Sequence, residues 1–269
     1  MSERYRRNAR SVLLEHLFSV GGGGRLQHVP FATVGMMKLP QPILKTNDDG
    51  IDAPGIRILQ SIVESLGAEC LVVAPADAHS GCSHRINMDA PFHIERRAAN
   101  EIAVHSTPAD CVRVALHLLD APPALVLSGI NAGGNMGHDV YLSGTLAAAR
   151  EAAFHRLPAI AFSQYISPQV YLDKERIRRD TKRILEMLAP LPFEEGVYWN
   201  VNYPDLEPGA APPEIVRCER CTKALPPNYD VVDDHYEYQR GKYHDRPRTP
   251  GTDLDVCLSG SIAVTRMEL

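Results

Sequence analysis

Short apolar runs alternate with stretches of helical periodicity along most of this chain, and this alternation limits the folds that it can adopt. Four runs are short enough for buried strands: residues 43–46, 70–74, 125–127 and 159–162. Between the first two runs, Pro54 suits the first position of a helix, apolar residues recur at helical spacing, and Gly67 suits the helix end. The alternation predicts an α/β fold, with a doubly wound, mostly parallel sheet and helices on both of its faces.

The pattern continues toward the C-terminus and then fades. Four further elements are expected: a helix from Pro108 capped by Thr107, helices over 145–154 and 173–188, and a strand over 197–202. Residues 204–250 are rich in Pro, charge and Tyr and lack clean periodicity. We therefore expect an arm, over about 204–260, that leaves the core or contacts another subunit.

The N-terminal forty residues differ from the rest of the chain. They carry several arginines before a short apolar segment, and a run of four glycines follows. That segment is too short for a secretory signal, and no stretch of the chain approaches the length of a membrane span. We expect a poorly ordered extension over 1–40 and one domain over 41–269.

Composition and charge exclude some classes of partner. Among 269 residues, 44% are hydrophobic and 23% charged, which is ordinary for a soluble globular protein. A formal charge of −5 argues against a polynucleotide ligand, but not against a small anionic substrate beside a bound metal. The six cysteines include one C-x-x-C, at Cys218 and Cys221, without a second ligand pair. Free thiols in a reducing cytoplasm are the favoured interpretation, and a metal or redox role for that pair is the alternative.

Polar loops follow three of the predicted strands. Their residues are 47–50, 79–81 and 128–131. In a doubly wound sheet, the loops at the carboxyl ends of the strands form the binding site. The adjacent carboxylates of Asp48 and Asp49 repel each other unless a cation or strong donors compensate. By itself this motif could be a solvated Asx turn, but three converging loops favour a site.

These loops supply a set of oxygen donors. The set consists of Asp48, Asp49, the Ser80 hydroxyl and the Asn131 side-chain oxygen. Hard oxygen donors suit Mg²⁺ or Mn²⁺, with water filling the remaining positions. His79 and His84 flank Ser80, and ligation by either one is an alternative to a hydrogen-bonding role.

A glycine-rich segment lies beside this set. It reads G-x-x-x-G-G-x-x-G over 129–137, and Ser143-Gly144-Thr145 follows where a helix is expected to start. Glycine-rich backbone can approach a phosphate closely, and the free amides at a helix N-terminus attract anions. The spacing and the late helix start disfavour a dinucleotide fingerprint, and a purely structural loop is the other alternative. A phosphate cradle next to a metal is the favoured interpretation.

The motifs as a set resemble those of the SurE family of survival-protein nucleotidases. In order they are TNDDG at 46–50, AP and SG at 74–75 and 80–81, TPADCV at 107–112, SGINAG at 128–133, SGT at 143–145, NVNYP at 200–204 and GTD at 251–253. The resemblance covers about residues 43–266. The sequence differs from the usual family pattern in three places: the forty residues that precede the first strand, Ser106 where glycine is usual, and the C-terminal residues 264–267. None of them touches the expected ligands.

The resemblance implies an activity and an assembly. The activity is that of a metal-dependent phosphomonoesterase acting on nucleoside 5′- and 3′-monophosphates, with some activity on short polyphosphate. The family fold is a Rossmann-like core with an extended C-terminal hairpin or arm that helps to form homodimers and homotetramers. One Mg²⁺ or Mn²⁺ per subunit would be held by Asp48, Asp49, Ser80 and Asn131. Asn135, Ser143, Gly144 and Thr145 would surround the substrate phosphate.

We expect metal-assisted hydrolysis in which Asp48 ligates the ion and Asp49 orients or deprotonates the attacking water. An aspartyl-phosphate route is disfavoured because the two carboxylates are adjacent rather than spaced as Asp-x-Asp. A non-catalytic nucleotide or metal sensor and a phosphatase of a non-nucleotide substrate are the alternatives. Asp110 matches a family motif but suits a first-turn helix carboxylate equally well. Tyr141 and Tyr165 could stack on a base, and packing is their alternative role.

Overall fold

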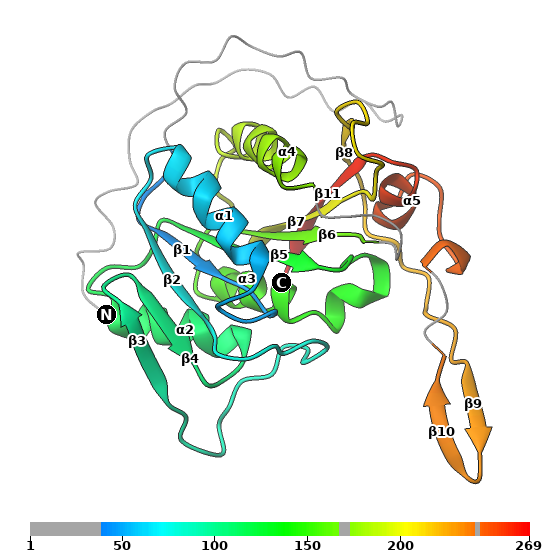
Figure 1. The fold of residues 1–269 in the computed structure, drawn as a ribbon, viewed down its shortest axis with the longest axis horizontal. Helices are drawn as coiled ribbons and strands as arrows, with labels where there is room; N and C mark the ends of the chain where they lie inside the picture. Colours follow the sequence, from blue (N-terminus) through cyan, green and yellow to red (C-terminus); the bar gives the residue numbers. More distant parts are fainter. Residues whose placement is uncertain (1–38, 167–172, 240–242) are drawn as a thin grey trace. The chain divides into compact units, whose positions relative to one another are not determined.

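A nine-stranded mixed sheet forms the centre of the structure, a computed structural model that describes residues 39–166, 173–239 and 243–269 (Figure 1). The strand order is β3-β4-β2-β1-β5-β6-β7-β11-β8. The strands are β1 (Ile43–Thr46), β2 (Cys70–Pro75), β3 (Ile94–Ala98), β4 (Glu101–Val104), β5 (Leu125–Ala132), β6 (Ala159–Gln164), β7 (Val197–Tyr203), β8 (Ile215–Arg217) and β11 (Ile262–Glu268). Neighbours from β4 to β7 are parallel, whereas β3 on β4 and β11 on β7 are antiparallel. The predicted α/β fold with a mostly parallel sheet is confirmed.

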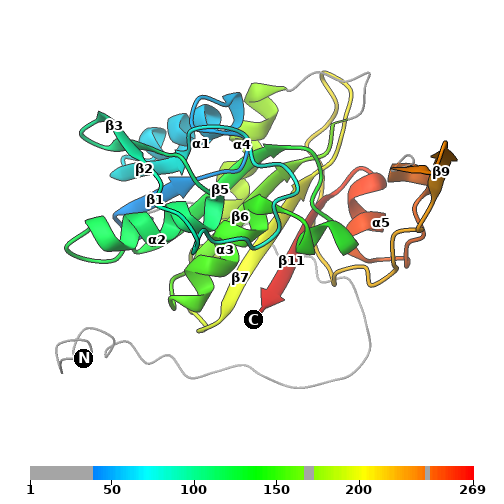
Figure 2. The ribbon, with the colours of Figure 1, turned by 90° about the horizontal axis from the view of Figure 1, so that it is seen from below.

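Helices cover both faces of this sheet, as Figure 2 shows. Helices α1 (Pro54–Ser65) and α4 (Lys174–Leu188) pack on one face, and α2 (Pro108–Leu118) and α3 (Gly144–Phe154) pack on the other. Successive side chains of a strand point to opposite faces, so Ile43 joins the first of these cores and Leu44 joins the second. The doubly wound arrangement therefore buries every central strand on both sides.

Local signals in the sequence set the helix ends. Pro54 occupies the start of α1, and Gly67 with φ of +68° follows its end, in the backbone region that favours glycine. Thr107 caps α2 by accepting a hydrogen bond from the backbone N–H of Asp110 at 3.2 Å. The sequence does not predict β3 or β8, because these short edge strands have too few buried residues to form an apolar run.

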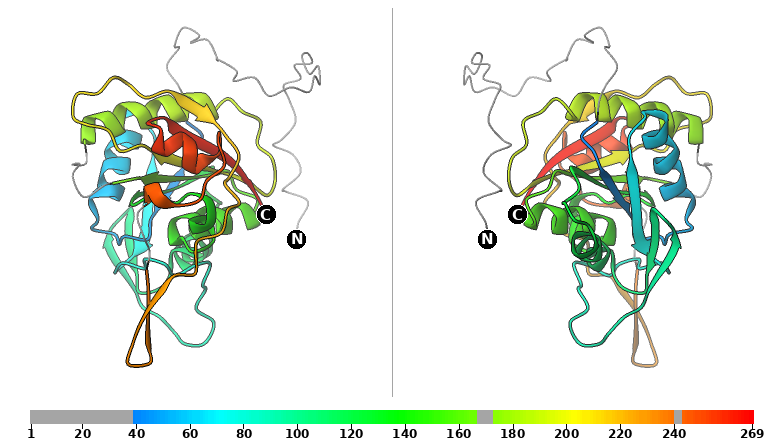
Figure 3. Two further views of the ribbon diagram at one scale, coloured as in Figure 1. Left: turned by 90° about the vertical axis from the view of Figure 1, so that its right-hand side faces the viewer. Right: turned by 90° about the vertical axis from the view of Figure 1, so that its left-hand side faces the viewer.

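The region expected to be an arm divides into three parts. Strand β8 joins the main sheet, and the short helix α5 (Asp253–Leu258) packs against β11. Between them, β9 (Tyr229–Val232) and β10 (His235–Tyr238) form a separate antiparallel hairpin, which Figure 3 shows from two sides. The expected N-terminal extension lies almost entirely outside the described residues, so it stays a prediction. Among the described residues, no helix is long and apolar enough to cross a membrane.

Candidate active site at the carboxyl edge of the sheet

Asp48 lies where three segments of the chain meet. It follows β1, and only 4% of its surface is exposed. The hydroxyl of Thr145, in the first turn of α3, donates a hydrogen bond to Asp48 Oδ1. The backbone carbonyl of Asp48 accepts a hydrogen bond from the backbone N–H of His79 at 2.7 Å, in the loop after β2. The loop after β1 is thus hydrogen-bonded both to the start of α3 and to the loop after β2.

Asp49 connects this point to the third loop. Its Oδ2 accepts a hydrogen bond from the backbone N–H of Ala132 at 3.0 Å, at the end of β5. The neighbouring Asn131 donates from Nδ2 to the carbonyl of Gly133 at 2.8 Å, so its oxygen Oδ1 is the atom left to accept or ligate. Ser80 is exposed and lies next to His79, on the loop that contacts Asp48. The structure thus brings the four expected ligands to one edge of the sheet.

The electrostatics of the two carboxylates favour a cation. Burial raises the pKa of Asp48 to about 6, the hydrogen bond from Thr145 opposes this change, and the charge of Asp49 adds to it. Burial also raises the pKa of Asp49, against the hydrogen bond from Ala132. In the described part of the chain, no Lys or Arg forms an ion pair with either carboxylate.

The available donors fit a hard divalent ion. Two carboxylates, an amide oxygen and a hydroxyl are the ligand types that Mg²⁺ and Mn²⁺ prefer. No group of three or more His, Cys, Asp and Glu side chains that could hold a metal occurs among the described residues. The alternative ligand His84 is engaged elsewhere, since its Nε2 lies 2.8 Å from Glu151.

The first turn of α3 packs directly against Asp48. A Cβ atom on Gly144 would lie 2.8 Å from Asp48 Cβ and 2.9 Å from Cys82 Sγ, so this position has room only for glycine. Ser143 caps the helix by accepting a hydrogen bond from the backbone N–H of Leu146 at 3.1 Å. The first backbone N–H groups of a helix lack intrahelical partners and favour anions. The start of α3 therefore lies where a phosphate held beside Asp48 could reach it.

Asn135 is hydrogen-bonded to residues of the sheet strands β6 and β7. Its Nδ2 donates to Ser163 Oγ at 2.8 Å, and its backbone N–H donates to Asn202 Oδ1 at 2.8 Å. Its carbonyl accepts from the side chains of Asn200 and Asn202 at 2.9 and 3.2 Å. Asn135 therefore anchors the glycine-rich segment. Ser163, Asn200 and Asn202 were not identified as site residues, and the signal that could have found them is polar side chains in otherwise apolar strands.

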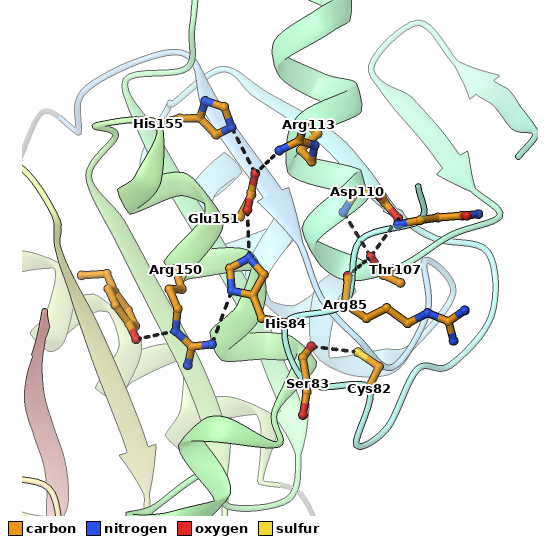
Figure 4. A network of polar contacts seen from close by, with 12 residues as sticks. Cys82, Ser83, His84, Arg85, Thr107, Asp110, Arg113, Arg150, Glu151 and His155 are labelled. Carbon is orange, nitrogen blue, oxygen red and sulfur yellow. Dashed lines mark hydrogen bonds and ion pairs between the residues drawn. The ribbon is translucent and has the colours of Figure 1, made fainter. Parts of the chain in front are cut away.

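The loop that carries Ser80 is tied to α3 by a buried carboxylate, drawn in Figure 4. Glu151 lies 2.8 Å from His84, 2.8 Å from Arg113 and 3.1 Å from His155. Burial by itself would raise the pKa of Glu151, but the hydrogen bonds from His84 and Arg113 outweigh it and lower this pKa to about 2. The ionised carboxylate thus holds the Ser80 loop on the helix whose first turn contacts Asp48.

The same loop is tied to α2 by Thr107 and Asp110 (Figure 4). Thr107 Oγ1 donates to the carbonyl of Arg85 at 2.6 Å. Asp110 Oδ2 accepts from the backbone N–H of Asn87 at 3.0 Å and from the hydroxyl of Ser106. These contacts give Asp110 a structural role in the described chain.

A second buried carboxylate ties the glycine-rich segment to the C-terminal region. Asp253 Oδ2 accepts from the backbone N–H of Gly137 at 2.8 Å, and its Oδ1 accepts from that of Cys221 at 2.7 Å. All six cysteines are free, and Cys218, Cys221 and Cys257 pack in a small apolar cluster. No disulfide forms among these six cysteines, and the free-thiol interpretation of the C-x-x-C stays a prediction.

Neither tyrosine considered for base stacking faces a second aromatic ring in a stacked geometry within the described chain. Tyr141 is exposed and lies under the guanidinium of Arg220, 5.1 Å from it. Tyr165 is buried and contacts His244 edge-on at 6.0 Å. Its burial and its contact with His244 therefore favour the packing role of Tyr165 over base stacking.

Comparisons with known proteins agree with this geometry. A family model described as "Survival protein SurE" matches residues 43–224. The "Putative 5'-nucleotidase alr3139" of Nostoc is 47% identical over 227 residues, covering 84% of this chain and 99% of the relative. The "5'-nucleotidase SurE" of Cereibacter sphaeroides is 37% identical over 241 residues, covering 84% of this chain and 92% of the relative. The crystal structure of the Sure protein from Aquifex aeolicus superposes with a TM-score of 0.72 at 29% identity, covering 84% of this chain and 92% of that one.

Proposed function

This chain belongs to the SurE family, and we propose that it is a 5′-nucleotidase: a divalent-metal-dependent phosphomonoesterase that releases phosphate from nucleoside monophosphates. The observation that carries the proposal is the meeting of Asp48, Asp49 and the start of α3 at one edge of the sheet. Carboxylates bind a cation and helix amides bind an anion, so the two features together suit a metal-bound phosphate.

Each residue has a proposed part in the reaction. Asp48, Asp49, Ser80 and Asn131 hold the cation. When bound, the cation supplies a Lewis acid that polarises a phosphoryl oxygen and lowers the pKa of water. Asp49 is more exposed than Asp48, and we assign to it the orientation or deprotonation of the attacking water. Thr145 keeps Asp48 in one orientation through its hydrogen bond.

The phosphate-binding part of the proposal rests on the start of α3. Gly144 and Thr145 present backbone N–H groups to the phosphate, and Ser143 fixes the first turn that carries them. Asn135 contributes the second N–H of its Nδ2, since the first donates to Ser163, and it sets the position of the glycine-rich loop. Because residues on the loop after β2 and on α3 are linked through Glu151, both halves of the site keep one spacing.

The wider proposal includes further substrates, an assembly and a location. Nucleoside 3′-monophosphates and short polyphosphate are further substrates that the family resemblance suggests. The β9–β10 hairpin leaves Tyr229, Val231, Val232 and Tyr236 between 53% and 72% exposed. A lone two-stranded hairpin is marginally stable in water, and a large exposed apolar patch commonly marks an interface. We therefore propose a homodimer or homotetramer through this hairpin, and a cytoplasmic location consistent with six free thiols.

Phosphate release tests the central proposal. Purified protein is given AMP, GMP, CMP or UMP, with Mn²⁺, with Mg²⁺ or with excess EDTA, and inorganic phosphate is measured. Release with the metals and its loss in EDTA are the expected results, and the Asp48→Asn variant is expected to release none. A folded protein that releases no phosphate with either metal would move the assignment to a sensor or to another phosphorylated substrate.

A further inference from the structure

An apolar cavity of about 360 Å³ opens beside the carboxylate of Asp49. Its polar end is formed by Asp49 and Asn131, and its walls include Ile58, Ile130, Ile166 and Ile177. Ile58 comes from α1, Ile177 from α4 and Ile130 from β5, whereas Ile166 follows β6. The cavity is therefore continuous with the proposed metal site and runs from it between two helices.

Close backbone packing fixes one wall of this cavity. A Cβ atom on Gly55, at the start of α1, would lie 1.8 Å from the carbonyl oxygen of Ile130, so only glycine lets α1 approach β5 this closely. Ile58 and Ile177 are 5% and 1% exposed, which places both in the core and leaves them little freedom to fill the space. Walls formed by two helices and a strand make the cavity a preformed site.

We propose that this cavity binds the nucleoside part of the substrate. The proposal rests on the proposed function, because it takes the reacting phosphate to lie at Asp49 and Asn131. The ester bond of that phosphate leads to the nucleoside, and the cavity is the apolar space that adjoins both residues. Sites for small organic ligands commonly have volumes of roughly 300–1,000 Å³, apolar walls and a few polar groups at one end.

The chemistry of the walls predicts how bases are selected. The four isoleucines can bury a ring but offer no donor or acceptor side chain to its edge. Strong discrimination needs a site that hydrogen-bonds the substrate, whereas apolar contacts discriminate weakly. We therefore expect kcat/KM values for AMP, GMP, CMP and UMP to lie within roughly a hundredfold of one another. Purines rank first because they bury more apolar area.

Binding of adenosine tests the subsite without relying on turnover. Adenosine carries the base and ribose but no phosphate, and its dissociation constant is measured by calorimetry on the metal-free protein. Ile58→Phe places a larger side chain in the cavity, and Ile166→Asp puts a charge on an exposed residue of its wall, where folding tolerates the change. Each is expected to weaken adenosine binding by about tenfold or more.

Phe193→Asp is the matched control, because Phe193 is also an exposed apolar residue but does not line the cavity. It is expected to bind adenosine as the unaltered protein does. Adenosine binding that is undetectable in the unaltered protein, or equal in Ile166→Asp and Phe193→Asp, would overturn the subsite. Absence of phosphate release from any nucleotide would instead count against the proposed function, and the adenosine result would still decide whether the cavity binds nucleosides.

Discussion

Replacing Asp48 by asparagine is expected to stabilise the metal-free protein while abolishing its activity. The exchange is close to isosteric, and the asparagine Oδ1 can still accept the hydrogen bond from Thr145. What changes is the buried charge. Burial raises the pKa of Asp48 from its ordinary value of 3.8 to about 6. At pH 7 the folded protein must therefore ionise a carboxyl group that resists ionisation more than it does in the unfolded chain.

The size of the effect follows from this pKa. One pKa unit corresponds to about 1.4 kcal/mol, so the change from 3.8 to about 6 corresponds to roughly 3 kcal/mol of unfolding free energy. The folded-state pKa is raised, so the group favours folding most at pH values below 3.8, and this contribution is lost as pH rises through 6. In EDTA, Asp48→Asn should therefore be more stable than the unaltered protein at pH 7, and the difference should shrink toward pH 4.

Urea denaturation at pH 7 and pH 4, in EDTA and in Mn²⁺, measures the unfolding free energy of each protein and the stabilisation that the metal adds. Mn²⁺ at a hundred times its dissociation constant is expected to stabilise the unaltered protein by about 2.7 kcal/mol. It should stabilise the variant far less. Asp52→Asn is the control, since Asp52 is exposed and hydrogen bonds from Arg97 lower its pKa, which reverses the sign of the charge effect. A variant that is less stable than the unaltered protein in EDTA, or that gains equally from Mn²⁺, would refute the reasoning.

Two other perturbations test the elements around the site. Glu151→Gln should lower the unfolding free energy at pH 7 by roughly 3 to 3.5 kcal/mol, because the pKa of Glu151 is lowered from 4.5 to about 2. That stability is present above pH 4.5 and is lost as pH falls through about 2. Urea denaturation should therefore show a smaller difference in unfolding free energy between Glu151→Gln and the unaltered protein at pH 3 than at pH 7. As a control, Glu175→Gln removes one partner of an exposed ion pair and should change the unfolding free energy by no more than about 0.5 kcal/mol. Val232→Ser with Tyr236→Ser, on the exposed hairpin, should reduce the molar mass seen by light scattering without changing the melting temperature of the core. An unchanged mass would exclude the hairpin as the subunit contact, and equal losses in the two glutamine variants would remove the special role of Glu151.

Much of the fold can be read from local sequence. The runs at 43–46 and 70–74 become parallel neighbours β1 and β2, and Pro54 and Gly67 bracket the helix between them. These features depend on residues a few positions apart, whose periodicity and backbone preferences act locally. The same holds for Asp48 and Asp49, because a parallel sheet places the loops after its strands at one edge.

The tertiary structure decided what surrounds those residues. Glu151 and His84 are 67 positions apart, and Asn135 and Asn202 are likewise 67 apart, yet each pair forms a hydrogen bond that sets the position of a loop. The raised pKa of Asp48 and the cavity beside Asp49 depend on how tightly the helices pack on the sheet. The sequence by itself determined which donors and which strands were present. Packing between distant segments decided their burial, their partners and the space beside them, because desolvation and contact depend on where atoms lie in space and not on their separation along the chain.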